Sequence, residues 1–324
     1  MHMKRKVVLA FLLTGALVLS GCSKTNNSNE TSSGSTSTDS SAQGIDVSNM
    51  FSDRDKEIGY DEENSTVIKL SDDSTTCDSD AVQISGNTVT IIDEGTYILS
   101  GTLTDGMVIV DAEDTDKVQL VLDGVDITSA ESAAIYVREA DKVFITTASD
   151  SQNTLTNGGT YTAIDDNNID AAIFSKSDLT LNGAGSLTIT AKAGHGVVSK
   201  DDLVLTSRTY QIDAASHGLS GKDSVRIASG SYTIVSGKDG IHAENADDTS
   251  LGFVYLADGT FDITSDGDGI SAGNWLQADG GVYTVKAGGG SENVQKSDGE
   301  WQFGPGQQTE STDTTEEDTV SMKA

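Results

Sequence analysis

A short pattern of small and aliphatic residues recurs in the middle of the chain, and this repeat constrains the fold more than any other feature. The copies are Ala172–Ser175, Gly196–Ser199, Gly218–Gly221, Gly240–Ala243 and Gly269–Ala272, and their starts are 24, 22, 22 and 29 residues apart. A unit this short cannot bury its apolar face alone, whereas stacked copies make a continuous core. The repeat therefore predicts a stack of similar units.

Further apolar positions recur at nearly the same steps. The clearest column is Leu187, Tyr210, Tyr232, Phe261 and Tyr283. Within each repeat such positions alternate with polar residues, which is typical of strands with one buried face. Three short strands in each repeat predict an all-β, single-stranded parallel β-helix, a solenoid of about seven coils from about Val82 to Lys286. The aromatic column should point into its core rather than form a sugar-stacking platform.

The N-terminus has the pattern of an exported bacterial lipoprotein. Basic residues 4–6 precede the apolar run Val7–Leu19, which is too short to span a membrane. The run ends in a lipobox-like segment, Leu19–Cys22. We expect a signal peptide over residues 1–21 and a lipid on Cys22.

The remaining chain divides by composition. Residues 22–49 are rich in Ser and Thr and predict a flexible tether, and residues 50–81 predict an N-terminal cap. The β-helix domain is expected over residues 82–288, with a flexible polar tail over residues 289–324.

Acidic residues outnumber basic ones by far. The chain has 20 Lys+Arg and 51 Asp+Glu, a net charge of −31, and removal of the three leader cations leaves 17 − 51 = −34. This charge argues against a nucleic-acid partner and against surface binding to anionic lipid, so we expect membrane contact through the lipid on Cys22 only. The 34 glycines and single proline suit many tight turns and exclude a helical bundle.

Polar residues recur in register at one predicted turn. Lys176, Lys200 and Lys222 form one column, and the carboxylates that follow are Asp178, Asp201, Asp202 and Asp223. On adjacent rungs about 4.8 Å apart, these carboxylates repel unless a cation lies between them. Ca²⁺ suits such a set of oxygen ligands, and the acidic residues Asp165 and Asp166 of a preceding insertion are further candidate ligands. The alternatives are neutralisation by the stacked lysines and a purely structural hydrogen-bonded ladder.

Other candidate residues are fewer. Trp275 lies in a predicted turn, and together with Lys176 it is a candidate for sugar contact. His195 and His217 share a column with Asp239 and Asp268 of later repeats, which indicates a capping or ligand role rather than a general base.

Several motifs, taken in order, resemble one family. They are Ala172–Leu179, Gly196–Leu203, Gly218–Val225, Asp239–Ile241, Gly95–Gly101 and Leu120–Val125. The chain resembles the clostridial-type carbohydrate-binding β-helix surface lipoproteins from about Met50 to Lys286. The resemblance implies a right-handed parallel β-helix similar to family 9 pectate lyases, bound Ca²⁺, and binding rather than cleavage of plant cell-wall glycans such as cellulose and polygalacturonate. Family members continue into further coils after a segment like Ser321–Ala324, where this chain stops.

Three functions follow as hypotheses. The first is a monomeric, calcium-containing polysaccharide-binding protein, exported and lipid-anchored at the outer face of the bacterial cell membrane. The second is a calcium-dependent pectate lyase with Lys200 or Lys222 as the base. The third is a structural surface adhesin or spacer without a sugar ligand.

Overall fold

The computed structural model describes residues 45–288 and 322–323. The predicted signal peptide, the lipidation at Cys22 and most of the predicted tether lie outside these residues, as does most of the predicted tail. Two short helical segments precede the first strand: α1 (Asp53–Lys56) and the 3₁₀ turn Glu62–Asn64. Neither is long or apolar enough to cross a membrane, and the described residues contain no other helix.

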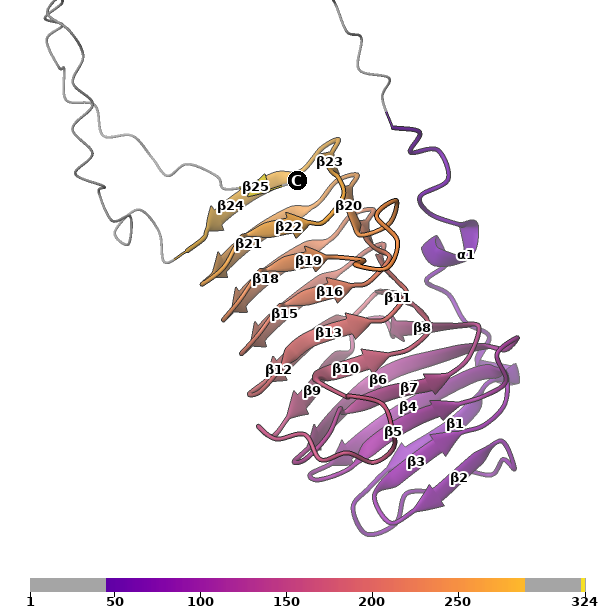
Figure 1. The fold of residues 1–324 in the computed structure, drawn as a ribbon. Coiled ribbons are helices and arrows are strands. Elements are labelled where there is room, and N and C mark those ends of the chain that lie inside the picture. The colour runs from indigo at the N-terminus through magenta and orange to yellow at the C-terminus, as the bar shows by residue number, and fades with distance from the viewer. Residues whose placement is uncertain (1–44, 289–321, 324) are drawn as a thin grey trace, which may run out of the picture. The chain divides into compact units, whose positions relative to one another are not determined.

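The strands form two sheets, and the strands of successive repeats lie side by side within each (Figure 1). Every pairing between named strands within the described ranges is parallel except that of β2 with β3. The ten-stranded sheet consists of β2 (Val82–Ser85), β3 (Thr88–Ile91), β5 (Met107–Asp111), β7 (Ile135–Glu139), β10 (Ala171–Ser175), β13 (His195–Ser199), β16 (Leu219–Gly221), β19 (Ile241–Ala243), β22 (Ile270–Ala272) and β25 (Met322–Lys323).

The fifteen-stranded sheet has two arms that meet at the long strand β6 (Lys117–Ser129). The first arm holds β8 (Lys142–Thr147), β11 (Asp178–Gly183), β14 (Asp202–Leu205), β17 (Ser224–Ile227), β20 (Phe253–Leu256) and β23 (Leu276–Ala278). The second arm holds β9 (Gln152–Asn157), β12 (Ser186–Ala191), β15 (Thr209–Ala214), β18 (Ser231–Ser236), β21 (Thr260–Ser265) and β24 (Val282–Lys286). Strands β1 (Thr66–Leu70) and β4 (Gly95–Leu103) continue from β6.

This arrangement corrects the predicted architecture. A simple single-stranded right-handed parallel β-helix of about seven equivalent coils is wrong, because the strands join into two sheets of 15 and 10 strands. Strand β6 pairs with β8 along its first half and with β9 along its second. Two of the three strand columns expected from the repeat are therefore joined into one continuous sheet. One end carries the antiparallel β2–β3 pair, and residues 322–323, expected in a flexible tail, form β25. Two mostly parallel sheets packed around one core resemble a β-sandwich more closely than a simple helix.

The predicted register of the repeat is confirmed. Tyr210 pairs with Tyr232, Tyr232 with Phe261, and Phe261 with Tyr283. The first three rings are about 1% exposed, and adjacent rings stack with centroids 4.8–5.2 Å apart. The column is therefore a buried stack, as the alternation of apolar and polar residues predicted, and it belongs to the main core.

A second apolar cluster lies under the insertion that precedes β10. Tyr136 and Phe174, paired in register on β7 and β10, pack there with Val198 of β13 and with Ile169 and Tyr161 of the insertion. These rings belong to a cluster separate from the main core. The insertion thus covers apolar side chains that the ten-stranded sheet would otherwise expose.

The segment around α1, residues 50–57, is called here the N-terminal strap. Its Asp55 binds Lys142 of β8 and Thr180 of β11, and its backbone carbonyl at Asp55 accepts a hydrogen bond from Thr206, which follows β14. Arg226 of β17 donates to the carbonyl of Met50 at 3.1 Å. The strap therefore crosses successive strands of the first arm, while β1 adds to the sheet beside β4.

Candidate functional site

The predicted carboxylates lie where the chain passes from the ten-stranded sheet into the first arm of the fifteen-stranded sheet. Asp178, Asp202, Ser224, Phe253 and Trp275 occupy equivalent positions at this turn, because the residues beside them pair in register. Asp201 and Asp223 directly precede Asp202 and Ser224. We call the set Asp178, Asp201, Asp202, Asp223, Phe253 and Trp275 the acidic–aromatic strip.

The carboxylates of the strip perturb one another. Burial, followed by the charge of Asp202, raises the pKa of Asp178. Burial also raises the pKa of Asp201 to about 6, with further contributions from Asp178 and Asp223. This is the crowding that the spacing predicted, and it disfavours the charged forms of Asp178 and Asp201 unless a cation is present.

Protein donors satisfy part of the strip. Asp202 accepts a hydrogen bond from Ser224 Oγ at 2.6 Å and forms an ion pair with Arg226. Asp223 Oδ1 accepts from the side-chain amide of Asn245 at 2.6 Å. Arg226 is the cationic side chain that pairs with a strip carboxylate among residues 45–288.

The stacked lysines turn elsewhere. Lys200 Nζ lies 5.2 Å from the centroid of the Phe174 ring, over the outer face of the ten-stranded sheet. Lys222 Nζ lies 2.7 Å from Asp247 Oδ2, and Lys176 is exposed. Neutralisation of the ladder by these lysines, one of the alternatives from the sequence, therefore has no ion pair to support it in the described part of the chain.

An aromatic pair continues the strip beyond its carboxylates. The rings of Phe253 and Trp275 stack with centroids 4.3 Å apart and planes 11° from parallel, and both residues are half-buried. Sequence reasoning singled out Trp275 and missed Phe253, because the insertion over residues 245–252 interrupts the spacing. The signal was present: Phe253 and Trp275 directly precede the apolar residues Val254 and Leu276, just as Asp178 and Asp202 directly precede Leu179 and Leu203.

The other predicted ligands lie apart from the strip. Asp165 accepts hydrogen bonds from Tyr136 at 2.8 Å and from Arg138 at 3.0 Å, and Arg138 also pairs with Asp111. Asp166 is exposed. The side-chain partners of Asp165 are residues of β7, and the backbone N–H of Asn167 also donates to it at 2.8 Å, so Asp165 neutralises Arg138 rather than adding to the carboxylate ladder.

The histidine column caps backbone groups of the next repeat. His195 Nδ1 accepts from the N–H of His217 at 3.3 Å, and His217 Nδ1 accepts from the N–H of Asp239 at 3.1 Å. Asp239 Oδ1 accepts in the same way from the N–H of Asp268 at 2.8 Å. Burial lowers the pKa of His195 and of His217 to about 4. The exchange of His with Asp predicted a capping or ligand role, and these hydrogen bonds show the capping role.

Comparison with known proteins identifies the class. The family described as "Carbohydrate-binding domain-containing protein" matches residues 85–324, most of the chain. The chain belongs to this family of carbohydrate-binding domain-containing proteins.

Two proteins are similar to parts of this chain. A protein of Acetivibrio thermocellus with the same description is 37% identical over 150 residues, which cover 45% of this chain and 52% of that protein. The chain thus spans about half the length of this curated relative. The solved structure of the polysaccharide lyase-like protein from C. thermocellum, a gadolinium derivative, is 34% identical with a TM-score of 0.60, covering 69% of this chain and 93% of that one. The resemblance to a clostridial carbohydrate-binding family is confirmed, whereas the lipid anchor and the likeness to pectate lyases stay predictions.

Proposed function

We propose that this protein binds an anionic cell-wall polysaccharide such as polygalacturonate along the acidic–aromatic strip, with Ca²⁺ held by the strip carboxylates. One observation carries the proposal: crowded carboxylates and a stacked aromatic pair occupy consecutive register positions at one turn. Family membership supports a carbohydrate ligand.

Calcium follows from the charge of the strip. Asp178, Asp201 and Asp223 have no ion pair with the neighbouring lysines in the described residues, and Ca²⁺ takes six to eight oxygen ligands in flexible geometry. A bound Ca²⁺ would relieve the mutual repulsion of these carboxylates, and oxygens of the polysaccharide could complete its coordination. An anionic sugar needs such a bridge, because the chain has a net charge of −31.

The aromatic pair supplies the second type of contact. Phe253 and Trp275 are half-buried, so an edge or face of each stays open to solvent beside the carboxylates. Aromatic rings offer rigid apolar area against which the apolar face of a sugar ring packs. Neutral glucans such as cellulose would use this contact without the metal.

Binding rather than cleavage is the activity that the geometry favours. A lysine base needs a lowered pKa, but the hydrogen bond and charge of Asp247 raise the pKa of Lys222. Lys200 lies over Phe174, on the outer face of the ten-stranded sheet. The lyase hypothesis would regain support if polygalacturonate gave unsaturated products whose absorbance disappeared in Lys200→Ala or Lys222→Ala.

The place of action is proposed from the leader. A lipid on Cys22 would hold the protein at the outer face of the bacterial membrane, with residues 22–49 as a spacer. The protein would act there as a monomer. Metabolic labelling with a radioactive fatty acid should mark the protein, and Cys22→Ser should abolish the label and release the protein into the medium.

The binding proposal is tested by retention on insoluble polygalacturonate and cellulose, with Ca²⁺ and with chelator. The full chain carrying Cys22→Ser should bind polygalacturonate only with Ca²⁺, and cellulose in both conditions. Asp201→Asn combined with Asp223→Asn should weaken calcium binding by about tenfold or more and polygalacturonate binding with it. Trp275→Ala should weaken the binding of both polysaccharides by about 1 kcal/mol, which is roughly fivefold in affinity.

Two matched variants serve as controls. Asp213→Asn removes an exposed carboxylate from β15, and Val282→Ala removes an exposed apolar side chain from β24. Both should bind like the parent. Failure of the folded, calcium-loaded parent to bind either polysaccharide would favour the adhesin or spacer hypothesis instead.

A further inference from the structure

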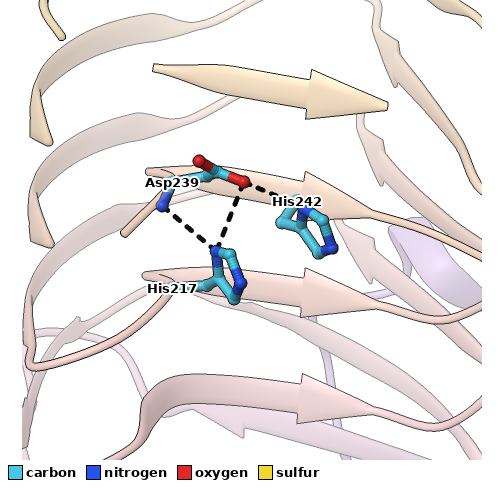
Figure 2. Close-up of side chains that lie close together, drawn as sticks. All are labelled: His217, Asp239 and His242. Carbon is cyan, nitrogen blue, oxygen red and sulfur yellow. Dashed lines mark hydrogen bonds and ion pairs between the residues drawn. The ribbon is translucent and has the colours of Figure 1, made fainter. Parts of the chain in front are cut away.

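Two imidazoles and a carboxylate from adjacent repeats converge on the outer side of the ten-stranded sheet. Figure 2 shows His217, just before β16, and His242, on β19, with their rings beside the carboxylate of Asp239. Asp239 Oδ2 lies 3.0 Å from His242 Nδ1 and 3.5 Å from His217 Nδ1. One ligand atom from each side chain lies within 4.8 Å of the other two.

The capping column does not account for this arrangement by itself. Capping needs one acceptor in each repeat, and His217 and Asp239 already provide it. His242 stands outside that column, in register with Ser220 and Ser271. The His242 ring stacks on that of His217 with centroids 4.2 Å apart. Nδ1 of His242 and Nδ1 of His217 both lie close to Asp239 Oδ2.

Two of the three separations are close to those of ligands around a small metal ion, and the third, between the two nitrogens, is within 4.8 Å. Tetrahedral Zn²⁺ with ligand distances of about 2.0–2.1 Å places its ligand atoms about 3.4 Å from one another. The two nitrogen–oxygen separations at Asp239, 3.0 and 3.5 Å, bracket this value. Imidazole nitrogen together with carboxylate oxygen suits Zn²⁺, Ni²⁺ and Cu²⁺, whereas Ca²⁺ prefers oxygen ligands alone.

The cluster is also accessible. The side chains of His217, Asp239 and His242 are 13%, 16% and 20% exposed. Asp239 lines a surface hollow of about 350 Å³ together with Asp266 and Asp268. The partial exposure of the three side chains therefore gives a metal access to the site without unfolding.

We propose that His217, Asp239 and His242 form a binding site for a divalent transition metal, with Zn²⁺ as its reference ion and with one coordination position open to water or to a ligand oxygen. This site is separate from the acidic–aromatic strip and independent of the proposed polysaccharide binding. At His217, Nδ1 already accepts the N–H of Asp239, so a metal at this atom displaces that hydrogen bond and binds less tightly than at a nitrogen without a competing donor.

The test is titration of the full chain carrying Cys22→Ser with Zn²⁺ by calorimetry and with Co²⁺ by visible absorption. One equivalent should bind, and Co²⁺ should give the intense bands of a four-coordinate ion. A large excess of Ca²⁺ should not displace either metal.

The chain offers variants that spare the cap. His217→Asn and Asp239→Asn each keep an oxygen to accept the backbone N–H of the next repeat, and His242→Ser installs the residue of the neighbouring repeats. Each should weaken Zn²⁺ binding by at least about tenfold. His195→Asn is the matched control, because His195 caps in the same column but lies outside the cluster. The proposal is overturned if the folded parent binds no Zn²⁺, if the three variants bind like the parent, or if His195→Asn loses the same affinity as they do.

Discussion

At the scale of single residues, equivalent tyrosines of the buried aromatic column differ in the hydrogen bonding of their hydroxyls, and therefore in their contribution to stability. The Tyr232 hydroxyl donates to the carbonyl of Ser229 at 2.8 Å, and that of Tyr283 donates to Gly280 at 2.7 Å. The Tyr210 hydroxyl is buried and has no hydrogen-bond partner among the described residues. A buried polar group without a partner costs about 1–3 kcal/mol, whereas a satisfied one contributes about 1 kcal/mol.

Removal of these two hydroxyls should therefore change stability in opposite directions. Tyr210→Phe should raise the free energy of unfolding by about 1 kcal/mol, and Tyr232→Phe should lower it by about 1 kcal/mol. Phe261 already occupies the next position of the column, so the ring alone is compatible with the stack. Urea denaturation of the two variants measures the difference, and equal shifts of the same sign would contradict the assignment.

The glycine of the repeat has a steric reason. A Cβ added to Gly218 would lie 2.5 Å from Ile234 Cγ2 and 2.6 Å from the carbonyl oxygen of Gly240. Gly218→Ala should lower the free energy of unfolding by about 1–3 kcal/mol through overpacking. The control is Gly273→Ala, where the nearest atom is 3.4 Å away and the expected change is within about 0.5 kcal/mol. Thermal or urea unfolding would show comparable losses for both variants if the explanation were wrong.

At the scale of elements, the N-terminal strap connects strands that are distant in sequence. Asp55 is 3% exposed, and its carboxylate meets Lys142 Nζ at 2.8 Å and Thr180 Oγ1 at 2.6 Å. Arg54 stacks its guanidinium on the ring of Phe144, 4.7 Å from the centroid. The strap thus buries a charge in order to bind β8 and β11, and its stability depends on that charge being paired.

The strap predicts a pH dependence. Burial alone would raise the pKa of Asp55, but hydrogen bonds from Lys142, Thr180 and Ser52 lower it to about 2 from an ordinary 3.8. Because the folded-state pKa is the lower one, the ionised carboxylate stabilises the fold above pH 3.8, and this contribution is lost as the pH falls towards 2. It amounts to about 2 kcal/mol.

Asp55→Asn should lower the free energy of unfolding at pH 7 by about that amount and flatten its decline between pH 4 and 2. Asp53→Asn, an exposed change in the same helix, should leave both unchanged. Denaturation at a series of pH values makes the comparison. If Asp55→Asn lost as much stability as the parent between pH 4 and 2, this role would be excluded.

At the scale of the whole molecule, net charge dominates. A charge of −31 on 324 residues makes every added carboxylate costly in the folded state, and the strip concentrates four of them at one turn. We therefore expect cations to act on this protein in two ways: by general screening, and by the proposed occupation of the strip.

The two effects separate in unfolding experiments. An increase from about 10 to 150 mM NaCl shortens the screening length from about 30 to 8 Å and should raise the Tm. CaCl₂ at equal ionic strength should raise it further, and Asp201→Asn combined with Asp223→Asn should remove only this additional part. Identical Tm values in the two salts would contradict a calcium site in the strip.

How far the sequence predicted the molecule depends on the range of the interactions involved. Alternation of apolar and polar residues set which side chains face the core, and the spacing of the repeat set the register, so that Tyr210 meets Tyr232 and Asp202 meets Ser224. Both are determined by the sequence alone, because the alternation follows from local strand geometry and a one-residue slip would expose every buried side chain. The capping column was predictable for the same reason.

Tertiary structure alone decided the rest. The joining of two predicted strand columns through β6 and the strap, which is bound by residues up to 176 positions away, arise from contacts between distant segments. Such contacts depend on where whole strands and insertions come to lie, and local periodicity contains no information on that placement.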